Sequence, residues 1–482
     1  MKSLPQLLPT PSSTLPSLEF QRRKLRAVLN KLSLSDQLEL YRYQQELRPV
    51  CDHMWRKQHK RLDFRSVERN LQGEPLSYFL NRMSENYRYV YFTADRLQEN
   101  LNVLETAGIK ALSNVKHCEL FLSQKAEQKP PKPEDEQQQP LHVMLPPSAS
   151  QCGAGDAGLG RAPGPGRVVG LAAVLGGAMM PQWPLHALPK MLRNLKRLKV
   201  HCEVQVHFIE QFPMLELLVL HGEIAQSALT GILERCKKLK RLFIKAPRPP
   251  SHLQGIASCR RLQDISLPLV LFNQVSDQIM PLPNLHLLEL HFGTLAHSPP
   301  LLIDSMRYVL QHSSKSVEIM QLNCKHFESP YWMREAGLDC CRQLQGLVLY
   351  NCRFDDREIS ELNMPRVESY LVLSNCPDLK EYQLIDIVKR CSRLNELYLI
   401  DCPLLSGRIL QGIYRIRQSE KIDYPINIIL SHCDAISKEY QEAYTDYWQF
   451  KLDVLKLDRL LREHHIMEDL QIFFHKNQTD KS

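Results

Sequence analysis

Leu344-Gln-Gly-Leu347-Val-Leu349-Tyr-Asn-Cys352 and Leu394-Asn-Glu-Leu397-Tyr-Leu399-Ile-Asp-Cys402 are two copies of one phrase, L-x-x-L-x-L-x-x-C. Its Leu-x-Leu centre has the period of two that places both leucines on one face of a short β-strand, and the cysteine turns inward where the strand ends. One copy cannot bury that face alone. Stacked copies can, because each strand's leucines cover those of its neighbour and a helix on the other side closes the core.

Weaker copies of the phrase recur along most of the chain, at spacings of roughly 20 to 32 residues. Between them, residues 228–236 and 384–391 carry apolar residues at helical steps and end in Arg-Cys. This pattern resembles the cysteine-containing class of leucine-rich repeat. We therefore predict an α/β fold, a leucine-rich-repeat solenoid of short parallel strands with helices on the opposite side. The further copies are centred on Leu62, Val90, Leu120, Leu198, Leu218, Leu242, Ile265, Leu288, Met320, Leu371 and Ile428.

The charge of the chain is mildly positive. Its 482 residues include 61 Lys and Arg against 53 Asp and Glu, a formal net charge of +8. Basic clusters at 22–24, 56–61, 190–199 and 237–241 have the charge to contact nucleic acid or phosphorylated partners. The interpretation we favour is that they mark helix C-termini, where positive charge complements the helix dipole. Nucleic acid is therefore not an expected partner.

The cysteines indicate a reducing compartment. Most of the 14 cysteines occupy repeat positions rather than paired spacings, and the N-terminus has no signal-peptide pattern. We expect them to be reduced core residues, which predicts a cytoplasmic or nuclear protein, or one found in both. No apolar run reaches the length of a membrane span, so no membrane partner is expected.

Composition divides the chain into six segments. Proline and serine mark a flexible tail, helical periodicity follows, and a stretch rich in Pro, Gln, Glu, Gly and Ala then interrupts the repeats as a disordered insert. After Cys433, residues 438–474 carry apolar and aromatic residues that favour a helical cap for the last repeat. The predicted segments are a tail at 1–15, a helical unit at 16–62, the first repeats at 63–122, the insert at 123–186, the main solenoid at 187–435, and a helical cap and tail at 436–482.

Few motifs suggest an enzyme. Gly153-Ala-Gly155-Asp-Ala-Gly158 matches the dinucleotide-binding pattern, but prolines flank it where a strand and a helix are required. The pairs His464-His465 and Cys340-Cys341 are adjacent in sequence, so their side chains point to different faces and do not converge on one ion. We therefore predict a non-catalytic protein without a cofactor or a metal site.

The block ahead of the first repeat contains three helical pieces, the second of which follows a Ser35-Asp36 start signal. Its spacing of Phe20, Leu25, Val28, Leu29, Leu32, Asp36, Leu38, Leu40 and Leu47 resembles an F-box. Trp55 followed by Leu62-Asp-Phe64 resembles the join between an F-box and the first repeat in F-box leucine-rich-repeat proteins. Gln21, Arg23 and residues 43–47 depart from the F-box pattern.

The resemblance implies the substrate-recognition subunit of a Skp-cullin-F-box type ubiquitin ligase. Exposed apolar side chains of an F-box dock on the Skp adaptor, and through it on a cullin, and a few anchors carry most of the energy of such an interface. The strand face of the solenoid would bind a protein substrate, with Tyr350 and Tyr398 as solvent-facing aromatic candidates unless they only shield the strand ladder. The candidate adaptor-binding residues, each equally well explained as helix core, are Phe20, Leu25, Val28, Leu29, Leu32, Leu38 and Leu40.

Other hypotheses remain open. The chain can instead be a leucine-rich-repeat interaction scaffold whose N-terminal helices cap the solenoid, an interpretation that the departures from the F-box pattern favour. A nucleic-acid or phosphoprotein binder driven by charge would require its basic residues to gather on one face. An enzyme has no motif in its support.

Overall fold

The structure is a computed structural model. It describes residues 18–122, 184–202, 206–222, 224–245, 253–291, 302–325, 331–354, 367–422 and 426–436, the single residues Phe327, Ser329, Asp356 and Lys438, and the backbone of 450–454. At 18–22 and at Cys202 it likewise describes the backbone alone. The described residues fall into two compact units, one formed by 18–122 with 184–344 and the other beginning at 345. Each unit is described by itself.

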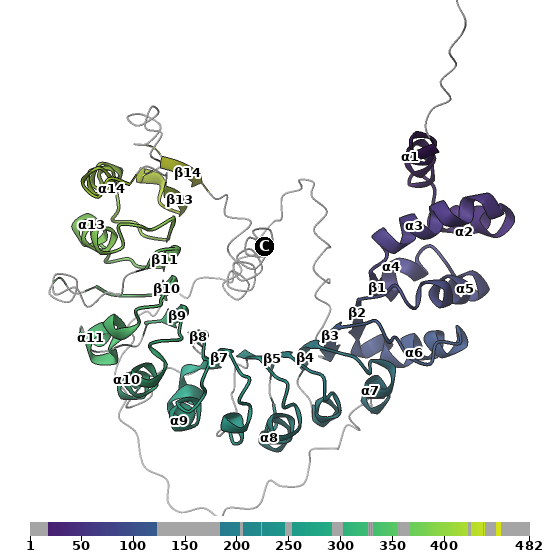
Figure 1. Cartoon of the computed structure of the whole chain (residues 1–482), viewed down its shortest axis with the longest axis horizontal. Coiled ribbons are helices and arrows are strands. Elements are labelled where there is room, and N and C mark those ends of the chain that lie inside the picture. The colour runs from purple at the N-terminus through teal and green to yellow at the C-terminus, as the bar shows by residue number, and fades with distance from the viewer. Residues whose placement is uncertain are drawn as a thin grey trace, which may run out of the picture. The chain divides into compact units, whose positions relative to one another are not determined.

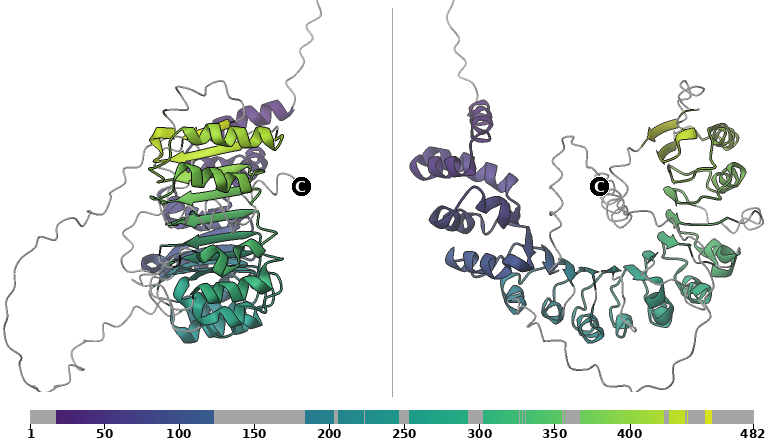
Figure 2. Two further views of the ribbon diagram at one scale, coloured as in Figure 1. Left: turned by 90° about the vertical axis from the view of Figure 1, so that its left-hand side faces the viewer. Right: turned by 180° about the vertical axis from the view of Figure 1, so that it is seen from behind.

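The first unit is built on a parallel sheet in which each strand pairs with the next one along the chain. Helices lie on one side of these strands (Figures 1 and 2). The strands are β1 (Arg61–Asp63), β2 (Tyr89–Thr93), β3 (His117–Leu122), β4 (Arg197–Cys202), β5 (Leu217–His221), β6 (Arg241–Lys245), β7 (Asp264–Pro268), β8 (Leu287–His291) and β9 (Ile319–Asn323). The covering helices are α5 (Gly73–Met83), α6 (Leu97–Thr106), α7 (Leu188–Met191), α8 (Gln226–Arg235), α9 (Leu269–Ile279), α10 (Leu302–Ser313) and α11 (Trp332–Ala336).

Every predicted strand of this unit is confirmed. The repeated phrase L-x-x-L-x-L explains why these segments form strands. Its two strand leucines face the helices and are fully buried, as Leu218 and Leu220 are in β5. They meet their equivalents on the neighbouring strands, where Leu198 pairs with Leu218 and Val200 with Leu220. Strand β3 pairs with β4 in the same register, although residues 123–183, which lie outside the described residues, separate them in sequence. The repeats therefore resume directly after the predicted insert.

Three helices precede the first strand, as the periodicity predicts. They are α1 (Leu18–Leu29), α2 (Leu34–Tyr43) and α3 (Arg48–Gln58), with a short 3-10 turn at Gln45–Leu47. The start of α2 differs from the prediction, because the capping residue is Ser33 and not Ser35. The Ser33 hydroxyl accepts a hydrogen bond from the Asp36 backbone N–H at 3.1 Å, which satisfies an N–H that has no partner within the helix.

A buried glutamine joins the three helices. The Gln37 side-chain amide on α2 donates to the backbone oxygens of Leu29 and Leu32, both at 3.0 Å, where α1 ends. Its oxygen accepts from the indole N–H of Trp55 on α3 at 2.8 Å. Because Gln37 and Trp55 are both buried, each of these polar groups would otherwise lack water and carry a desolvation cost.

The helices pack directly on the first repeat. The Trp55 ring meets Phe79 of α5 edge to face at 5.3 Å between ring centres.

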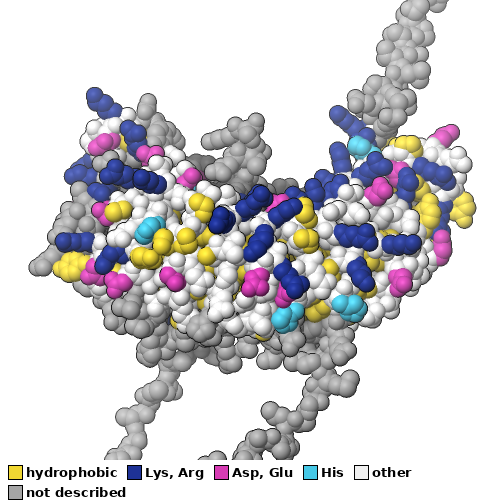
Figure 3. Space-filling view, turned by 60° about the horizontal axis from the view of Figure 1, so that its bottom comes forward, with side chains coloured by type: hydrophobic (Ala, Val, Ile, Leu, Met, Phe, Trp, Pro, Cys, Tyr) yellow, Lys and Arg dark blue, Asp and Glu magenta, His cyan; other side chains and the backbone are white. Residues whose placement is uncertain are grey.

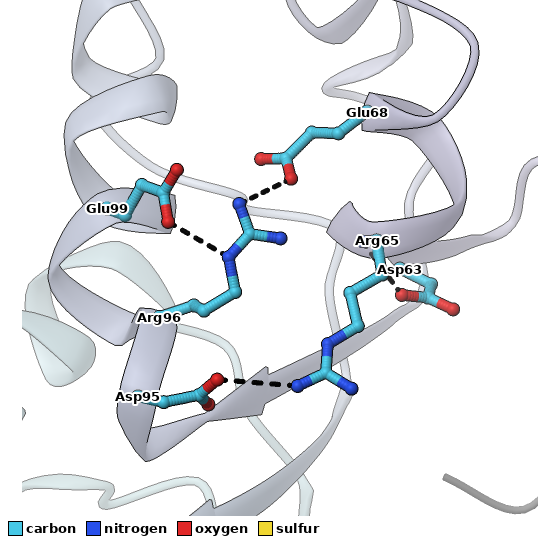
Figure 4. Close-up of polar contacts among 6 residues, drawn as sticks. All are labelled: Asp63, Arg65, Glu68, Asp95, Arg96 and Glu99. Atoms are coloured by element: carbon cyan, nitrogen blue, oxygen red, sulfur yellow. Dashed lines mark hydrogen bonds and ion pairs between the residues drawn. The ribbon is translucent and has the colours of Figure 1, made fainter. Parts of the chain in front are cut away.

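Ion pairs join the short helix α4 (Phe64–Glu68) of the first repeat to the 3-10 turn at Ala94–Arg96 of the second (Figure 4). Arg96 bridges Glu68 at 2.6 Å and Glu99 at 2.9 Å, and Arg65 reaches Asp95 at 3.4 Å. The pairs of Arg96 with Glu68 and of Arg65 with Asp95 connect successive repeats, whereas that of Arg96 with Glu99 lies within one. All three are partly exposed, so we assign them a structural role.

The second unit repeats the same plan. Its parallel strands also follow chain order, and its helices also lie on one side of them (Figure 1). The strands are β10 (Gly346–Tyr350), β11 (Tyr370–Ser374), β12 (Glu396–Ile400), β13 (Ile426–Ser431) and β14 (Phe450–Val454), and the helices include α13 (Glu381–Arg390) and α14 (Arg408–Ser419).

A left-handed residue followed by a buried cysteine ends each of the strands β10 to β13. Asn351, Asn375, Asp401 and His432 have φ between 51° and 53°, a region in which Asn and Asp are the most tolerated of the non-glycine residues. The turn aims the next residue inward, and Cys352, Cys376, Cys402 and Cys433 are buried. The cysteines whose side chains the structure describes are free thiols, and all of these except Cys340 are buried, which confirms their prediction as core residues. Burial raises the pKa of Cys391 at the end of α13 to about 11, so this thiol stays protonated at neutral pH.

The helical cap predicted for 438–474 is wrong at its centre. Residues Phe450–Val454 form strand β14, which pairs in parallel with β13. The alternation Phe450, Leu452, Val454 has the period of a strand, and an unpaired β13 edge offers the hydrogen-bonding partner that favours it. The rest of that segment after Lys438 lies outside the described residues, as do the predicted tail at 1–15 and nearly all of the insert.

Gln37→Ala should destabilise the first unit by about 2 kcal/mol, because it leaves the buried Trp55 indole N–H without its acceptor and removes a donor from the backbone oxygens of Leu29 and Leu32. Urea unfolding followed by tryptophan fluorescence measures this cost. Gln98→Ala on the exposed face of α6 is the matched control and should cost far less. Equal costs for the two variants would contradict the bridging role of Gln37.

Gly346→Ala should destabilise the second unit by about 1 to 3 kcal/mol, because a Cβ at this position would overlap the ring of Tyr370 on the neighbouring strand. The cost should fall markedly in a Tyr370→Ala background, where the ring is absent. A double-mutant cycle of unfolding free energies tests this. An unchanged cost in that background would show that the overlap is not the cause.

Candidate functional site

The adaptor-binding candidates lie on α1, on α2 and in the turn between them. Leu29 and Leu38 are buried in the core of the three helices, and Leu25, Leu32 and Leu40 are half-buried. Val28 is exposed, at 59%. Adjacent helical residues lie on different faces, so Leu29 turns to the core and Val28 to the solvent. Phe20 lies on α1, with its side chain outside the described part.

A basic surface cavity of about 610 Å³ is lined by residues of α2, α3 and α5, with Tyr41 and Tyr78 among them. Most of its charged side chains interact with other groups of the protein. Arg82 forms an ion pair with Asp52 at 2.6 Å, and the Arg48 guanidinium donates to the backbone oxygen of Tyr41 at 3.0 Å. The pKa of the exposed His53 imidazole is lowered, first by the nearby charge of Arg26. We therefore interpret this positively charged cavity as part of the packing boundary between the three helices and the first repeat.

The two substrate-surface candidates differ in exposure. Tyr350 is half-buried at the end of β10. Tyr398 is only 6% exposed, so the expectation that it faces solvent is wrong. It lies on β12 between Val372 and Ile429 of the neighbouring strands, which are also buried, and its hydroxyl donates to Glu396 at 2.9 Å. Tyr398 therefore shields the strand ladder, the alternative that the sequence left open.

The residues at the starts of strands β1 to β6 line up in one row, and all of them except Glu216 before β5 are basic. Backbone hydrogen bonds align them: the N–H of Arg88 donates to the backbone oxygen of Lys60 at 2.7 Å, and the N–H of Lys116 to that of Arg88 at 3.0 Å. The N–H of Lys196 donates in turn to the backbone oxygen of Lys116 at 2.9 Å. Glu216 and then Lys240 continue the ladder, at 2.7 and 2.8 Å. We call Lys60, Arg88, Lys116, Lys196 and Lys240 the basic row. One position further along, Arg61, Arg197 and Arg241 occupy the paired register of β1, β4 and β6.

The sequence alone could not show that these residues form a row, although the basic clusters at 56–61, 190–199 and 237–241 each contribute a residue to it. In each of those clusters the first residues do mark helix ends, such as Arg56 and Lys57 in the last turn of α3. The later residues begin a strand, and the parallel register brings them together from different repeats. Lys and Arg side chains follow one another along the upper rim of the surface drawn in Figure 3, from its middle toward the N-terminal helices.

Beyond β6 the ladder continues through Gln263, His286 and Glu318, and the basic row ends. His286, just before β8, lies between two carboxylates, with Nδ1 at 3.3 Å from Asp264 and Nε2 at 3.0 Å from Glu318. The hydrogen bond with Asp264, followed by the charges of both carboxylates, raises the pKa of His286 against the opposing effect of its burial. Arg241 also binds Asp264, at 2.8 Å, and so marks the end of the positive surface.

The motifs of possible chemical interest do not assemble into a reactive site within the described residues. No group of three or more His, Cys, Asp or Glu that could hold a metal is found in this part of the chain. Cys340 is exposed and Cys341 is buried, so the pair does point to different faces. The segments with Gly153 to Gly158 and with His464-His465 lie outside the described residues. No described helix is both long and apolar enough to cross a membrane.

His286→Gln should destabilise the first unit more at acid than at alkaline pH. A folded pKa above the unfolded value of about 6.5 means that the stabilisation is complete below the unfolded pKa and is lost as the pH rises through the folded pKa. We expect the cost at about pH 5.5 to exceed that at about pH 8.5 by roughly 0.5 kcal/mol, since the pair is partly exposed. Urea unfolding at both values measures it.

Glu318→Gln provides the control for this pH dependence. It removes one of the two carboxylates that raise the pKa of His286, so the pH trend caused by His286→Gln should shrink in that background. An equal cost of His286→Gln at both pH values would contradict the assigned pairing.

Comparison with known proteins adds no family to these observations. No family model matches the sequence, and no curated protein matches it either. What characterises the chain is therefore its own architecture: three helices joined by Gln37, followed by an α/β array of in-order parallel strands.

Proposed function

We propose that this protein is the substrate-recognition subunit of a Skp-cullin-F-box type ubiquitin ligase, with leucine-rich repeats as its substrate receptor and no catalytic role of its own. The observation that carries the proposal is an exposed apolar residue, Val28, on the three-helix unit that precedes the first repeat. The resemblance of the sequence to F-box leucine-rich-repeat proteins has the same order of parts. An adaptor held at one end of the chain would leave the repeats accessible to a substrate.

The apolar surface of α1 supports the adaptor part of the proposal. Val28 is exposed and Leu25 and Leu32 are half-buried, so these residues can anchor a partner without leaving the core of the unit. Leu29 and Leu38 are buried, and they hold the helices together. In hydrophobic interfaces a few such anchors supply most of the binding energy, provided that neighbouring side chains exclude water from them.

A scaffold whose N-terminal helices only cap the repeats is the second candidate. The contacts of Trp55 and of His59 with Phe79 favour it, because a cap needs this kind of packing on the first repeat. The two candidates differ in what residues 1–62 do. As a cap, they stabilise the repeats; as an F-box, they also retain one particular partner.

Val28→Asp should weaken retention of the Skp adaptor by about tenfold or more while leaving the fold intact, since it places a charge at an exposed anchor. The measurement is co-purification of the full chain with the adaptor, with a thermal melt to check folding. Leu404→Asp is the matched control, because Leu404 is also an exposed aliphatic residue, in the second unit, and its substitution should leave retention unchanged.

Two outcomes would overturn the proposal. One is a folded wild-type chain that never retains the adaptor. The other is a folded Val28→Asp variant that retains it as well as the wild type does. Loss of stability on deletion of residues 1–62, combined with either outcome, would favour the scaffold.

A further inference from the structure

The basic row offers cations that the protein itself does not neutralise. Lys60 and Lys116 of the row are exposed, as is Arg197 one position beyond the row on β4, and within the described part of the chain the side chains of these three residues make no hydrogen bond or ion pair. Arg88 lies between Lys60 and Lys116, and its guanidinium donates only to backbone oxygens, those of Glu85 and Asn114. Four positive charges therefore follow one another on adjacent strands without a carboxylate partner among the described residues.

The rest of the row is partly neutralised. Glu216 accepts from Lys196 at 2.6 Å and lies 3.6 Å from Lys240, so one carboxylate is shared by two lysines. The positive surface is consequently strongest from β1 to β4. His117 lies within this part, where its burial, followed by the charges of Arg197 and Lys116, lowers its pKa to about 4. Its ring is therefore neutral at physiological pH and adds no charge of its own.

The dimensions of the row fit an extended chain. Neighbouring strands lie about 4.8 Å apart, so the five intervals from Lys60 to Lys240 span about 24 Å. A peptide in extended conformation advances about 3.3 Å per residue, and about seven residues would cover this length. Carboxylates on such a segment can reach successive cations of the row.

Acidic protein fits this surface better than nucleic acid does. Proteins that bind single strands stack successive bases on several exposed aromatic rings. Here Tyr89 is 45% exposed beside His117, whereas Tyr91 on the same strand is buried. The chain's pI of about 8.7 also lies below the range above 9 that is typical of nucleic-acid-binding domains.

We propose that the basic row binds an extended acidic segment, about seven residues long, of a protein partner. The inference does not depend on the adaptor, because the row lies on the strands and the proposed adaptor anchors lie on α1. If the adaptor proposal also holds, the row gives the chemical class of a substrate segment. Aspartate, glutamate and phosphorylated side chains would all be bound through the same donors.

The test is binding of a fluorescein-labelled decapeptide of glutamate to the full chain, followed by fluorescence anisotropy at low salt. Lys60→Gln with Lys116→Gln should weaken binding by about tenfold, since each exposed ion pair contributes up to about fivefold. The control removes the same charge elsewhere, with Lys315→Gln and Lys389→Gln, which are both exposed and outside the row. A thermal melt verifies that both double variants are folded. A ten-nucleotide deoxythymidine strand is titrated in parallel.

Each result decides the inference. Binding of the peptide that is weakened only by the substitutions in the row supports it. No binding at low salt, or equal weakening by the control variant, overturns it, because net charge alone would then explain the affinity. Tighter binding of the oligonucleotide than of the peptide also overturns it, in favour of a nucleic-acid partner. Retention of the Skp adaptor by the Lys60 and Lys116 double variant, measured on the same preparation, reports separately on the adaptor proposal.

Discussion

In-register parallel pairing of short strands is the constraint on which this structure depends. Each strand presents its leucines to the helices, and each pairs at the same position with the next, as Leu198 does with Leu218. A shift by one residue would turn every leucine of that strand outward, so burial fixes the register. Positions that precede or follow the strands are then aligned as strictly as the leucines. The left-handed residue and the buried cysteine after β10 to β13 share this origin with the basic row before β1 to β6.

An array of this kind exposes the core of its first repeat unless something covers it. Here the three N-terminal helices do so, and Gln37 is the residue that makes them one unit, because it satisfies polar groups of both flanking helices at once. The same helices retain an exposed apolar residue on α1. Covering the first repeat and the proposed binding of a partner are therefore compatible, since they use different residues: Trp55 of α3 packs on Phe79, and Val28 of α1 is exposed.

The strands could be predicted from sequence because a period of two, repeated with buried leucines, has few physical interpretations. The same reasoning gave the helices and the buried cysteines. It failed for Tyr398, because a pattern shows which face a residue occupies and not how closely its neighbours shield it. It failed for β14, where a free sheet edge competes with local helical spacing. It also could not separate Val28 from Leu29, or find the basic row, whose members Lys116 and Lys196 are distant in sequence and meet only through the register.

The most direct test of this account concerns that register. Treatment of the folded chain with a short amine-reactive cross-linker, followed by mass spectrometry of the peptides, reports which lysines are neighbours. The account predicts a dominant link between Lys116 and Lys196, which occupy adjacent rungs on β3 and β4 despite the long segment between them. Absence of that link, with Lys116 joined instead to Lys237 or Lys238 at the helix exit of a different repeat, would contradict the pairing on which the fold and the proposed binding surface both rest.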